Sequence, residues 1–211
     1  MPVPFDLTLY FVTDHRQPIE QTVDITRAAV AGGVTMVQLR KPEAHGRQLL
    51  EEALALKAVL AGTGVPLIVN DRIDVAHAAG ADGVHVGQSD LPAAAARAIL
   101  GPDAIIGLSS VTPEEMAAID PAAVDYVGIG PFAATTTKGD AGDALAIEGT
   151  RHACRLSPVR MVAIGGITET NAADVATTGV EGISVVSALS EASDPRAAAH
   201  RLRAAFETGR G

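Results

Sequence analysis

A short apolar run recurs eight times along this chain of 211 residues, and nearly every run ends in polar residues. The runs are about five residues long, apolar on both faces, and each is followed by a longer Ala-rich segment, which is the pattern of a parallel strand covered by helices. They cover residues 7–14, 36–40, 66–71, 83–88, 105–110, 126–131, 161–166 and 182–187. Eight such units predict a single (β/α)8 TIM-barrel domain over residues 1–211, with the polar residues at the carboxyl ends of the strands meeting in one pocket.

The segments between the runs carry helix signals. Thr112 and Pro113, followed by Glu115, predict a capping box with proline at the first helical position, and Asp194-Pro195 repeats this opening. Candidate helices cover residues 18–31, 43–61, 72–79, 91–100, 113–119, 144–156, 169–178 and 195–207. Segment 132–143, after the sixth run, is long for a loop in a compact domain, which favours a functional loop over a mobile insertion.

Composition excludes several classes of partner. The net charge of −9 opposes binding to nucleic acid or anionic membranes, and the chain has no Trp for stacking on bases. We expect neither a signal peptide nor a membrane span, because no Lys or Arg precedes the first apolar run and no apolar stretch reaches about 18 residues. Cys154 is the only cysteine, which excludes an intrachain disulfide and favours a helix-packing role in a reducing cytoplasm. The oligomeric state stays open, with a homo-oligomer included.

The second run ends in two side chains suited to bind a polar ligand. Strand alternation places Gln38 and Arg40 on one side, toward the barrel interior, with Leu39 facing the helices. An inward guanidinium can bind a phosphate through two parallel hydrogen bonds, and Gln38 can orient an uncharged ring. The alternative is a structural ion pair between Arg40 and a neighbouring carboxylate.

Carboxylates follow the next two runs. Asn70-Asp71 closes the third run, and Asp90 follows the fourth. Two carboxylates from adjacent strand ends can hold Mg²⁺, which completes its coordination with water and substrate phosphates. Each aspartate could instead cap the helix that follows it.

Hydroxyl groups and an imidazole belong to the fourth and fifth runs. His85 lies inside the fourth run, where a hydrogen-bonded interior role is favoured over acid–base catalysis. Ser109 and Ser110 end the fifth run, and either hydroxyl could donate to a leaving oxygen or cap a turn.

The last three strand ends favour a phosphate site. Gly165-Gly166 ends the seventh run and Val186-Ser187 the eighth, and the loops after strands seven and eight are the usual phosphate cradle of such barrels. The sixth loop adds hydroxyls and a cation, and these residues are Thr135, Thr136, Thr137 and Lys138.

Together these motifs resemble the thiamine phosphate synthase family, whose members join the pyrimidine and thiazole halves of thiamine. The matching segments, in chain order, cover residues 10–14, 38–40, 69–71, 82–88 with Asp90, 107–109, 125–131, 135–138, 163–167 and 182–187. The resemblance covers almost the whole chain and implies a cytoplasmic transferase that uses Mg²⁺ and phosphorylated small-molecule substrates.

The resemblance also implies a role for each residue. The residues that would bind hydroxymethylpyrimidine pyrophosphate are Gln38, Arg40, Asn70, Ser109 and Lys138, with Arg40, Ser109 and Lys138 in catalysis. Asp71 and Asp90 would bind Mg²⁺. The residues that would bind the thiazole phosphate are Thr135, Thr136, Thr137, Gly166, Val186 and Ser187.

One position departs from the family pattern. The family usually continues Gln-x-Arg-x-Lys, whereas here Lys41 directly follows Arg40 and Pro42 occupies the expected Lys position. A shift of one residue on an extended strand moves a side chain to the other face. Lys41 is retained among the substrate-binding candidates, as a residue that could curl back at the strand end.

Two other functions fit parts of the same pattern. A thiazole tautomerase on this scaffold would need neither pyrophosphate nor Mg²⁺, and the aspartates together with Arg40 and Lys138 favour the synthase over it. A non-catalytic protein that binds phosphorylated ligands is the second alternative, and the irregular Lys41-Pro42 spacing keeps it open.

Overall fold

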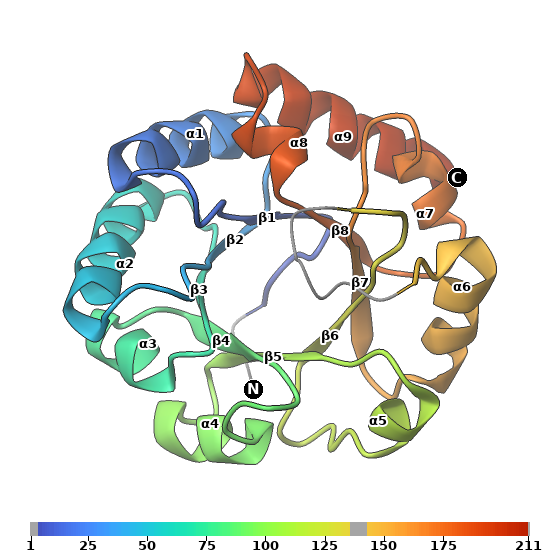
Figure 1. Cartoon of the computed structure of the whole chain (residues 1–211), viewed down its shortest axis with the longest axis horizontal. Coiled ribbons are helices and arrows are strands. Elements are labelled where there is room, and N and C mark those ends of the chain that lie inside the picture. Colours follow the sequence, from blue (N-terminus) through green and yellow to red (C-terminus); the bar gives the residue numbers. More distant parts are fainter. Residues whose placement is uncertain (1–3, 136–142, 211) are drawn as a thin grey trace.

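The chain forms a closed barrel of eight parallel strands, in which β1 pairs with β8 (Figure 1). This computed structural model describes residues 4–135 and 143–210. The strands are β1 (Leu9–Val12), β2 (Met36–Leu39), β3 (Leu67–Asn70), β4 (Gly83–Val86), β5 (Ile105–Ser109), β6 (Tyr126–Ile129), β7 (Arg160–Ile164) and β8 (Gly182–Val185). The barrel predicted from the apolar runs is confirmed, and each run contains most or all of one strand.

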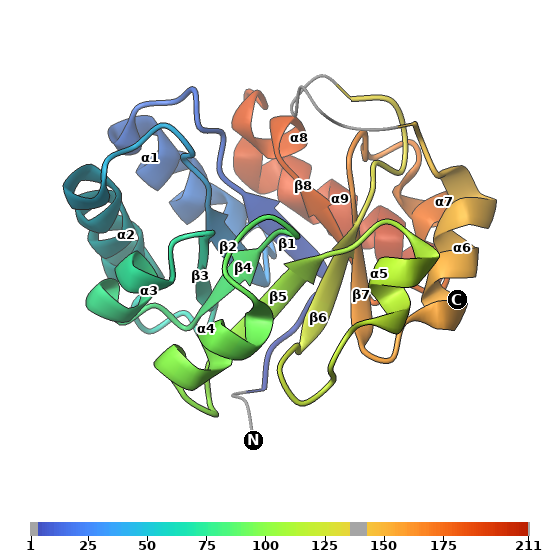
Figure 2. The ribbon, with the colours of Figure 1, turned by 60° about the horizontal axis from the view of Figure 1, so that its bottom comes forward.

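Helices surround the barrel and connect successive strands (Figures 1 and 2). They are α1 (Ile19–Ala31), α2 (Gly46–Leu60), α3 (Ile73–Ala79), α4 (Ala93–Leu100), α5 (Pro113–Ala117), α6 (Ala146–Leu156), α7 (Ala172–Ala176), α8 (Ser187–Ser190) and α9 (Pro195–Gly209). The predicted helices are all present, with ends that differ by a few residues. The one-turn helix α8 was not predicted, because a single turn is too short to show helical periodicity.

Two helix starts have the predicted caps. The Glu115 backbone N–H donates to Thr112 Oγ1 over 3.2 Å, and the Glu115 carboxylate accepts from the Thr112 backbone in return, so the capping box is confirmed. At α9, the Ala197 backbone N–H donates to Asp194 Oδ1 over 3.0 Å. Both helices begin at a proline, whose missing N–H needs no partner there.

The apolar core has two layers. One lies between strands and helices and contains Leu39. The other fills the barrel interior and consists of Leu7, Tyr10, Met36, Ile68, Ile105, Tyr126 and Val162. Since side chains alternate along a strand, the inward Met36 places Gln38 and Arg40 on the interior side, as predicted.

Two further expectations concern single features. Cys154 is half-buried and packs against the outer core layer, as expected of a helix-packing residue, and burial raises the pKa of its thiol. Within the described part of the chain, no helix has the length and apolar character needed to cross a membrane.

Candidate active site

Polar side chains from four neighbouring strands point toward the barrel axis at its carboxyl end. Alternation from the interior residues of β2, β3 and β5 brings Arg40, Asn70 and Ser109 to this side, and His85 on β4 joins them. Gln38 lies one step deeper, where it is buried and donates to the hydroxyl of Tyr10 over 2.6 Å. The structure therefore brings the predicted pyrimidine-side residues of these strands together.

Arg40 is half-buried at the end of β2. Its backbone N–H donates to Thr13 Oγ1 over 3.0 Å, which anchors the strand end to the first loop. Its guanidinium forms no ion pair with a carboxylate within residues 4–135 and 143–210, so the structural ion pair weighed as an alternative is not found there. Its charge acts on the nearby carboxyl group of Asp71 and favours the ionised form.

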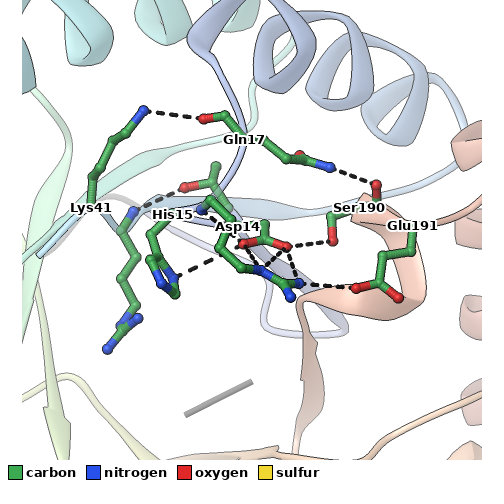
Figure 3. Close-up of polar contacts among 9 residues, drawn as sticks. Asp14, His15, Gln17, Lys41, Ser190 and Glu191 are labelled. Carbon is green, nitrogen blue, oxygen red and sulfur yellow. Dashed lines mark hydrogen bonds and ion pairs between the residues drawn. The ribbon is translucent and has the colours of Figure 1, made fainter. Parts of the chain in front are cut away.

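Lys41 has a different environment from its neighbour. Its Nζ lies 3.0 Å from Glu52 Oε1 on α2 and donates to the Gln17 carbonyl over 3.1 Å, the contact drawn in Figure 3. The Lys41 side chain is only 17% exposed and that of Glu52 only 7%. The shift of one residue has therefore placed this ammonium group against a helix and the first loop.

Neither aspartate caps a helix. α3 begins at Ile73 with Arg72 at its N-cap, and α4 begins at Ala93 with Pro92 at its N-cap. Asp90 Oδ2 instead accepts from the Gly87 backbone N–H over 2.7 Å, which fixes the carboxylate within its own loop.

Asp71 adopts a left-handed backbone conformation, with φ of 60°. Non-glycine residues in this region cluster at functional sites, where the surrounding structure compensates the strain. The Asp71 N–H still donates to the His85 carbonyl over 2.8 Å, so the β3–β4 ladder continues through the bend.

The two carboxylates interact directly. Burial, the charge of Asp90 and a side-chain hydrogen bond to Asp90 raise the pKa of Asp71 to about 6, against the opposing effects of Arg40 and Asn70. Among the described residues no third His, Cys, Asp or Glu completes a metal cluster. A pair of crowded carboxylates fits Mg²⁺, which takes one or two protein carboxylates and fills its other positions with water and phosphate oxygens.

The end of β5 is held by side chains from β4 and the loop after it. Ser109 Oγ lies 2.9 Å from His85 Nε2, so His85 is a hydrogen-bonded interior residue, as expected. Gln88 Nε2 donates to the Ser109 carbonyl over 2.7 Å and to Ser110 Oγ over 3.2 Å. Ser110 is fully buried, which leaves Ser109 as the partly exposed hydroxyl at this strand end.

The loop after β7 depends on glycine. Gly165 and Gly166 have φ of 96° and 65°, and a Cβ on Gly166 would lie 2.7 Å from the carbonyl oxygens of Ala133 and Ala134. The Asn171 side chain donates to the Gly166 carbonyl over 2.9 Å. This loop therefore packs closely against the loop after β6.

The remaining phosphate-site candidates lie at the neighbouring strand ends. Val186 follows β8, and Ser187 begins the short helix α8. Thr135 is half-buried after β6. The predicted residues Thr136, Thr137 and Lys138 lie outside the described residues.

A network at the barrel rim joins the first and last strand ends, and Figure 3 shows it in close-up. It consists of Asp14, Arg16, Gln17, Ser190 and Glu191, and we call it the rim network. Arg16 binds Asp14 Oδ1 through Nε over 2.9 Å and Glu191 Oε1 through Nη2 over 3.0 Å, while Gln17 Nε2 donates to the Ser190 carbonyl over 2.7 Å. The hydrogen bond from Arg16 lowers the pKa of the buried Asp14 carboxyl. The network ties the β1–α1 loop to α8, which begins at Ser187.

The family profile described as thiamine monophosphate synthase matches residues 9–189. The chain belongs to this family. A thiamine-phosphate synthase of Azorhizobium caulinodans is 56% identical over 211 residues, and one of Xanthobacter autotrophicus is 53% identical over 214 residues, both with full coverage of the two chains. A solved structure of a thiamine phosphate pyrophosphorylase from Pyrococcus furiosus has a TM-score of 0.87 at 37% identity, covering 97% of this chain and 98% of the other.

Membership of the synthase family confirms the resemblance drawn from the motifs, and the chain is a transferase of the thiamine-phosphate synthase type. The relatives named above carry the synthase name, so the tautomerase alternative gains no support. The predicted roles of single residues and of Mg²⁺ stay predictions.

Sequence reasoning missed two groups of residues in this synthase. Tyr10 and Tyr126 are the only tyrosines of the chain, and their hydroxyls lie 2.8 Å apart inside the barrel. Their positions inside apolar runs gave them the appearance of core residues, although a tyrosine on the interior face of a strand signals a buried hydroxyl that needs a partner. The rim network was missed because its contacts join residues up to 176 positions apart in the chain.

Proposed function

We propose that this chain condenses hydroxymethylpyrimidine pyrophosphate with hydroxyethylthiazole phosphate, giving thiamine phosphate and pyrophosphate, with Mg²⁺ as cofactor. The observation that carries the proposal is the pair of interacting carboxylates, Asp71 and Asp90, beside the guanidinium of Arg40, which has no carboxylate partner among the described residues. Such a site offers one face for a divalent cation and another for the oxygens of a pyrophosphate.

The reaction needs no general base. The bond between the pyrimidine methylene carbon and the pyrophosphate oxygen breaks, and its electron pair leaves with pyrophosphate. The lone pair of the thiazole nitrogen then forms the new carbon–nitrogen bond, and no proton has to move. This chemistry agrees with a site in which the interior histidine of the described strands, His85, lies within hydrogen-bond distance of Tyr126 and Ser109.

The protein's part is to position the substrates and to stabilise charge. Asp71 and Asp90 would hold Mg²⁺, which when bound supplies positive charge to the departing pyrophosphate. Arg40, Lys138 and the Ser109 hydroxyl act on the same leaving group, and such pre-placed charges act mainly on the transition state. Gln38 and Asn70 orient the pyrimidine.

The second substrate needs its own anion site on the other side of the pocket. We assign its phosphate to the sixth, seventh and eighth loops, and the residues are Thr135, Thr136, Thr137, Gly166, Val186 and Ser187. Close packing at Gly166 and the rim network beside Ser187 support this assignment, because both fix backbone groups before the ligand arrives.

The cytoplasm is the compartment that we assign. A single half-buried cysteine suits a reducing environment. Since the net charge is −9, the phosphorylated substrates have to be bound by local groups and not by the overall field of the protein.

The direct test mixes both phosphorylated substrates with the chain and Mg²⁺ and measures thiamine phosphate and pyrophosphate together. We expect equal amounts of the two products, and none when Mg²⁺ is chelated. If both ligands raise the melting temperature and no product forms, the chain is a binding protein. If the thiazole isomerises without pyrophosphate release, it is a tautomerase.

A further inference from the structure

A continuous chain of hydrogen bonds crosses the barrel interior from β2 to β5. It begins at Gln38, whose Nε2 donates to Tyr10 OH over 2.6 Å, and Tyr10 OH lies 2.8 Å from Tyr126 OH. His85 Nδ1 lies 3.0 Å from Tyr126 OH, and His85 Nε2 lies 2.9 Å from Ser109 Oγ. We call these five residues the interior chain. Its two ends, Gln38 and Ser109, are both substrate-binding candidates.

The barrel interior has space for the three rings of the interior chain. Tyr10 is 1% exposed and Tyr126 is fully buried. A Cβ on Gly107 of β5 would lie 2.2 Å from the Tyr126 ring and 2.4 Å from His85 Nδ1, so any other residue there would push both rings aside. The three rings therefore occupy space that the neighbouring strand leaves open.

The interior chain has a direction, because each member has one hydrogen to give to the next. If Gln38 donates to Tyr10, then Tyr10 donates to Tyr126, Tyr126 donates to His85 Nδ1, and His85 donates from Nε2 to Ser109. If the amide is reversed, every hydrogen bond reverses and the histidine proton moves to Nδ1. Burial raises the pKa of both tyrosine hydroxyls, so both keep the hydrogen that the chain needs.

The two directions present different groups to a ligand. In the first, the Ser109 hydroxyl hydrogen is free for an acceptor, and Gln38 Oε1 is free for a donor. In the second, His85 accepts the Ser109 hydrogen, so the Ser109 oxygen presents only lone pairs to the pocket, whereas the Gln38 amide presents its N–H hydrogens. A pyrophosphate is an acceptor only, so the second direction would set oxygen lone pairs against an anion.

We propose that the interior chain runs from Gln38 to Ser109, so that His85 is the Nε2–H tautomer and Ser109 is held as a hydrogen-bond donor toward the pyrophosphate. Tyr10, Tyr126 and His85 are then positioning residues that couple the group recognising the pyrimidine to the group facing its pyrophosphate. The role of the ligand rests on the proposed function, whereas the direction of the interior chain rests also on the Gln38 amide, which donates to Tyr10 without any ligand.

The test reads the protonated nitrogen of His85 by nitrogen NMR on ligand-free protein labelled at its six histidines, with His85→Gln to assign the signal. In the wild type we expect the proton on Nε2. Gln38→Glu replaces the amide donor with an acceptor on another strand, so we expect His85 Nδ1 to become protonated. In the double variant Gln38→Glu/Tyr126→Phe the chain is interrupted, and the change at position 38 should no longer reach His85.

The proposal is wrong if the wild-type proton lies on Nδ1, or if Gln38→Glu leaves the His85 signal unchanged. A residue with a merely structural role would not transmit such a change. Should Tyr126→Phe fail to fold, Tyr10→Phe interrupts the same chain.

Activity gives a second readout. We expect Tyr126→Phe to lower kcat/KM for the pyrimidine substrate about five- to tenfold, the effect of one hydrogen bond. The control is Ser184→Ala, which removes a buried interior hydroxyl beside Tyr10 that has no partner among the described residues, and it should leave kcat/KM unchanged. An equal loss in both variants would overturn the coupling. If wild-type His85 carries its proton on Nε2 and the protein forms no thiamine phosphate, the proposed function is wrong and the proposed direction of the interior chain is still supported.

Discussion

Arg40 and Lys41 are neighbours in the sequence, and their side chains lie in opposite electrostatic environments. Arg40 is on the interior side of β2, where no described carboxylate pairs with it and where it acts on Asp71. Lys41 is neutralised by Glu52 and bound to the Gln17 carbonyl. The positive charge of Arg40 is therefore available to bind a ligand, whereas that of Lys41 stabilises the packing of α2 and the first loop.

The difference shows how strand alternation decides the use of a charge. Family members usually carry the lysine two residues after the arginine. Here Pro42 occupies that position, and the lysine has moved to the face that packs on α2. The proposed reaction then relies on Arg40, Lys138 and Mg²⁺ for charge stabilisation.

The largest expected effect is a loss of kcat that distinguishes Arg40 from Lys41. We expect Arg40→Ala and Lys138→Ala each to lower kcat by about 10²- to 10³-fold, because each removes a charge that acts on the leaving pyrophosphate. Lys41→Ala should lower kcat less than about tenfold, since its ammonium is paired elsewhere. Steady-state kinetics with the pyrimidine substrate varied checks this. Comparable losses would show that Lys41 reaches the pyrophosphate, and a rise in KM alone for Lys138→Ala would remove its catalytic assignment.

The second prediction concerns the carboxylate that Arg40 faces. Asp71→Asn should weaken Mg²⁺ binding by more than about 100-fold. Replacing a residue that only orients a metal ligand costs roughly 10- to 100-fold in affinity, and Asp71 is proposed to be a ligand itself. Because the ligand must be ionised, Mg²⁺ affinity of the wild type should fall as the pH falls through the pKa of Asp71, about 6. Titration calorimetry with Mg²⁺ above and below that pH measures both effects. Affinity that does not change across this range would contradict the assignment.

The same carboxyl group predicts a stability change in the metal-free protein. Its folded pKa, about 6, lies above the ordinary value of 3.8, so the folded state holds the proton more tightly between these values. Stability should therefore fall as the pH rises through this range, and Asp71→Asn should reduce that fall. Thermal unfolding without Mg²⁺ tests it, and a fall of equal size in the variant would exclude Asp71 as its source.

A smaller effect is expected from the partner of Lys41. Glu52→Gln should destabilise the fold by about 1–2 kcal/mol, because it leaves a mostly buried ammonium group with neutral partners only. Denaturant unfolding of Glu52→Gln, Lys41→Met and the double variant gives the coupling between them. Additive losses would show that the ion pair contributes nothing to stability.

The smallest effect should come from restoring the family pattern. Pro42→Lys adds a second ammonium group two residues after Arg40, so we expect a lower KM for the pyrimidine substrate, by less than about tenfold. Pro42→Ala is the matched control without the charge. An equal change in both variants would attribute the effect to the loss of proline.

The apolar runs were sufficient to predict the barrel, because a closed parallel sheet is the architecture that buries eight two-sided strands. The same alternation correctly placed Gln38, Arg40 and Leu39. Whether Asp71 and Asp90 cap helices could not be decided from sequence, since the outcome depends on helix starts that are uncertain by a few residues. Only the structure, with α3 starting at Ile73 and α4 at Ala93, decides it.

Contacts between distant strands were beyond the reach of local patterns. The interior chain joins Tyr10 to Tyr126 across 116 positions, and nothing in either apolar run indicates that pairing. Lys41 is an intermediate case. The sequence spacing predicted that its side chain changes face, but only the fold shows that its ammonium group forms an ion pair with Glu52.

The central claim is that metal and protein charge at the ends of β2 to β5 drive the departure of pyrophosphate. The most direct measurement is a single-turnover reaction with both substrates bound, in which pyrophosphate and thiamine phosphate are followed with and without Mg²⁺. We expect the two products to appear at the same rate with Mg²⁺, and this rate to collapse without Mg²⁺ and in the Arg40→Ala variant. Pyrophosphate release at an unchanged rate without Mg²⁺, or without thiamine phosphate, would contradict it.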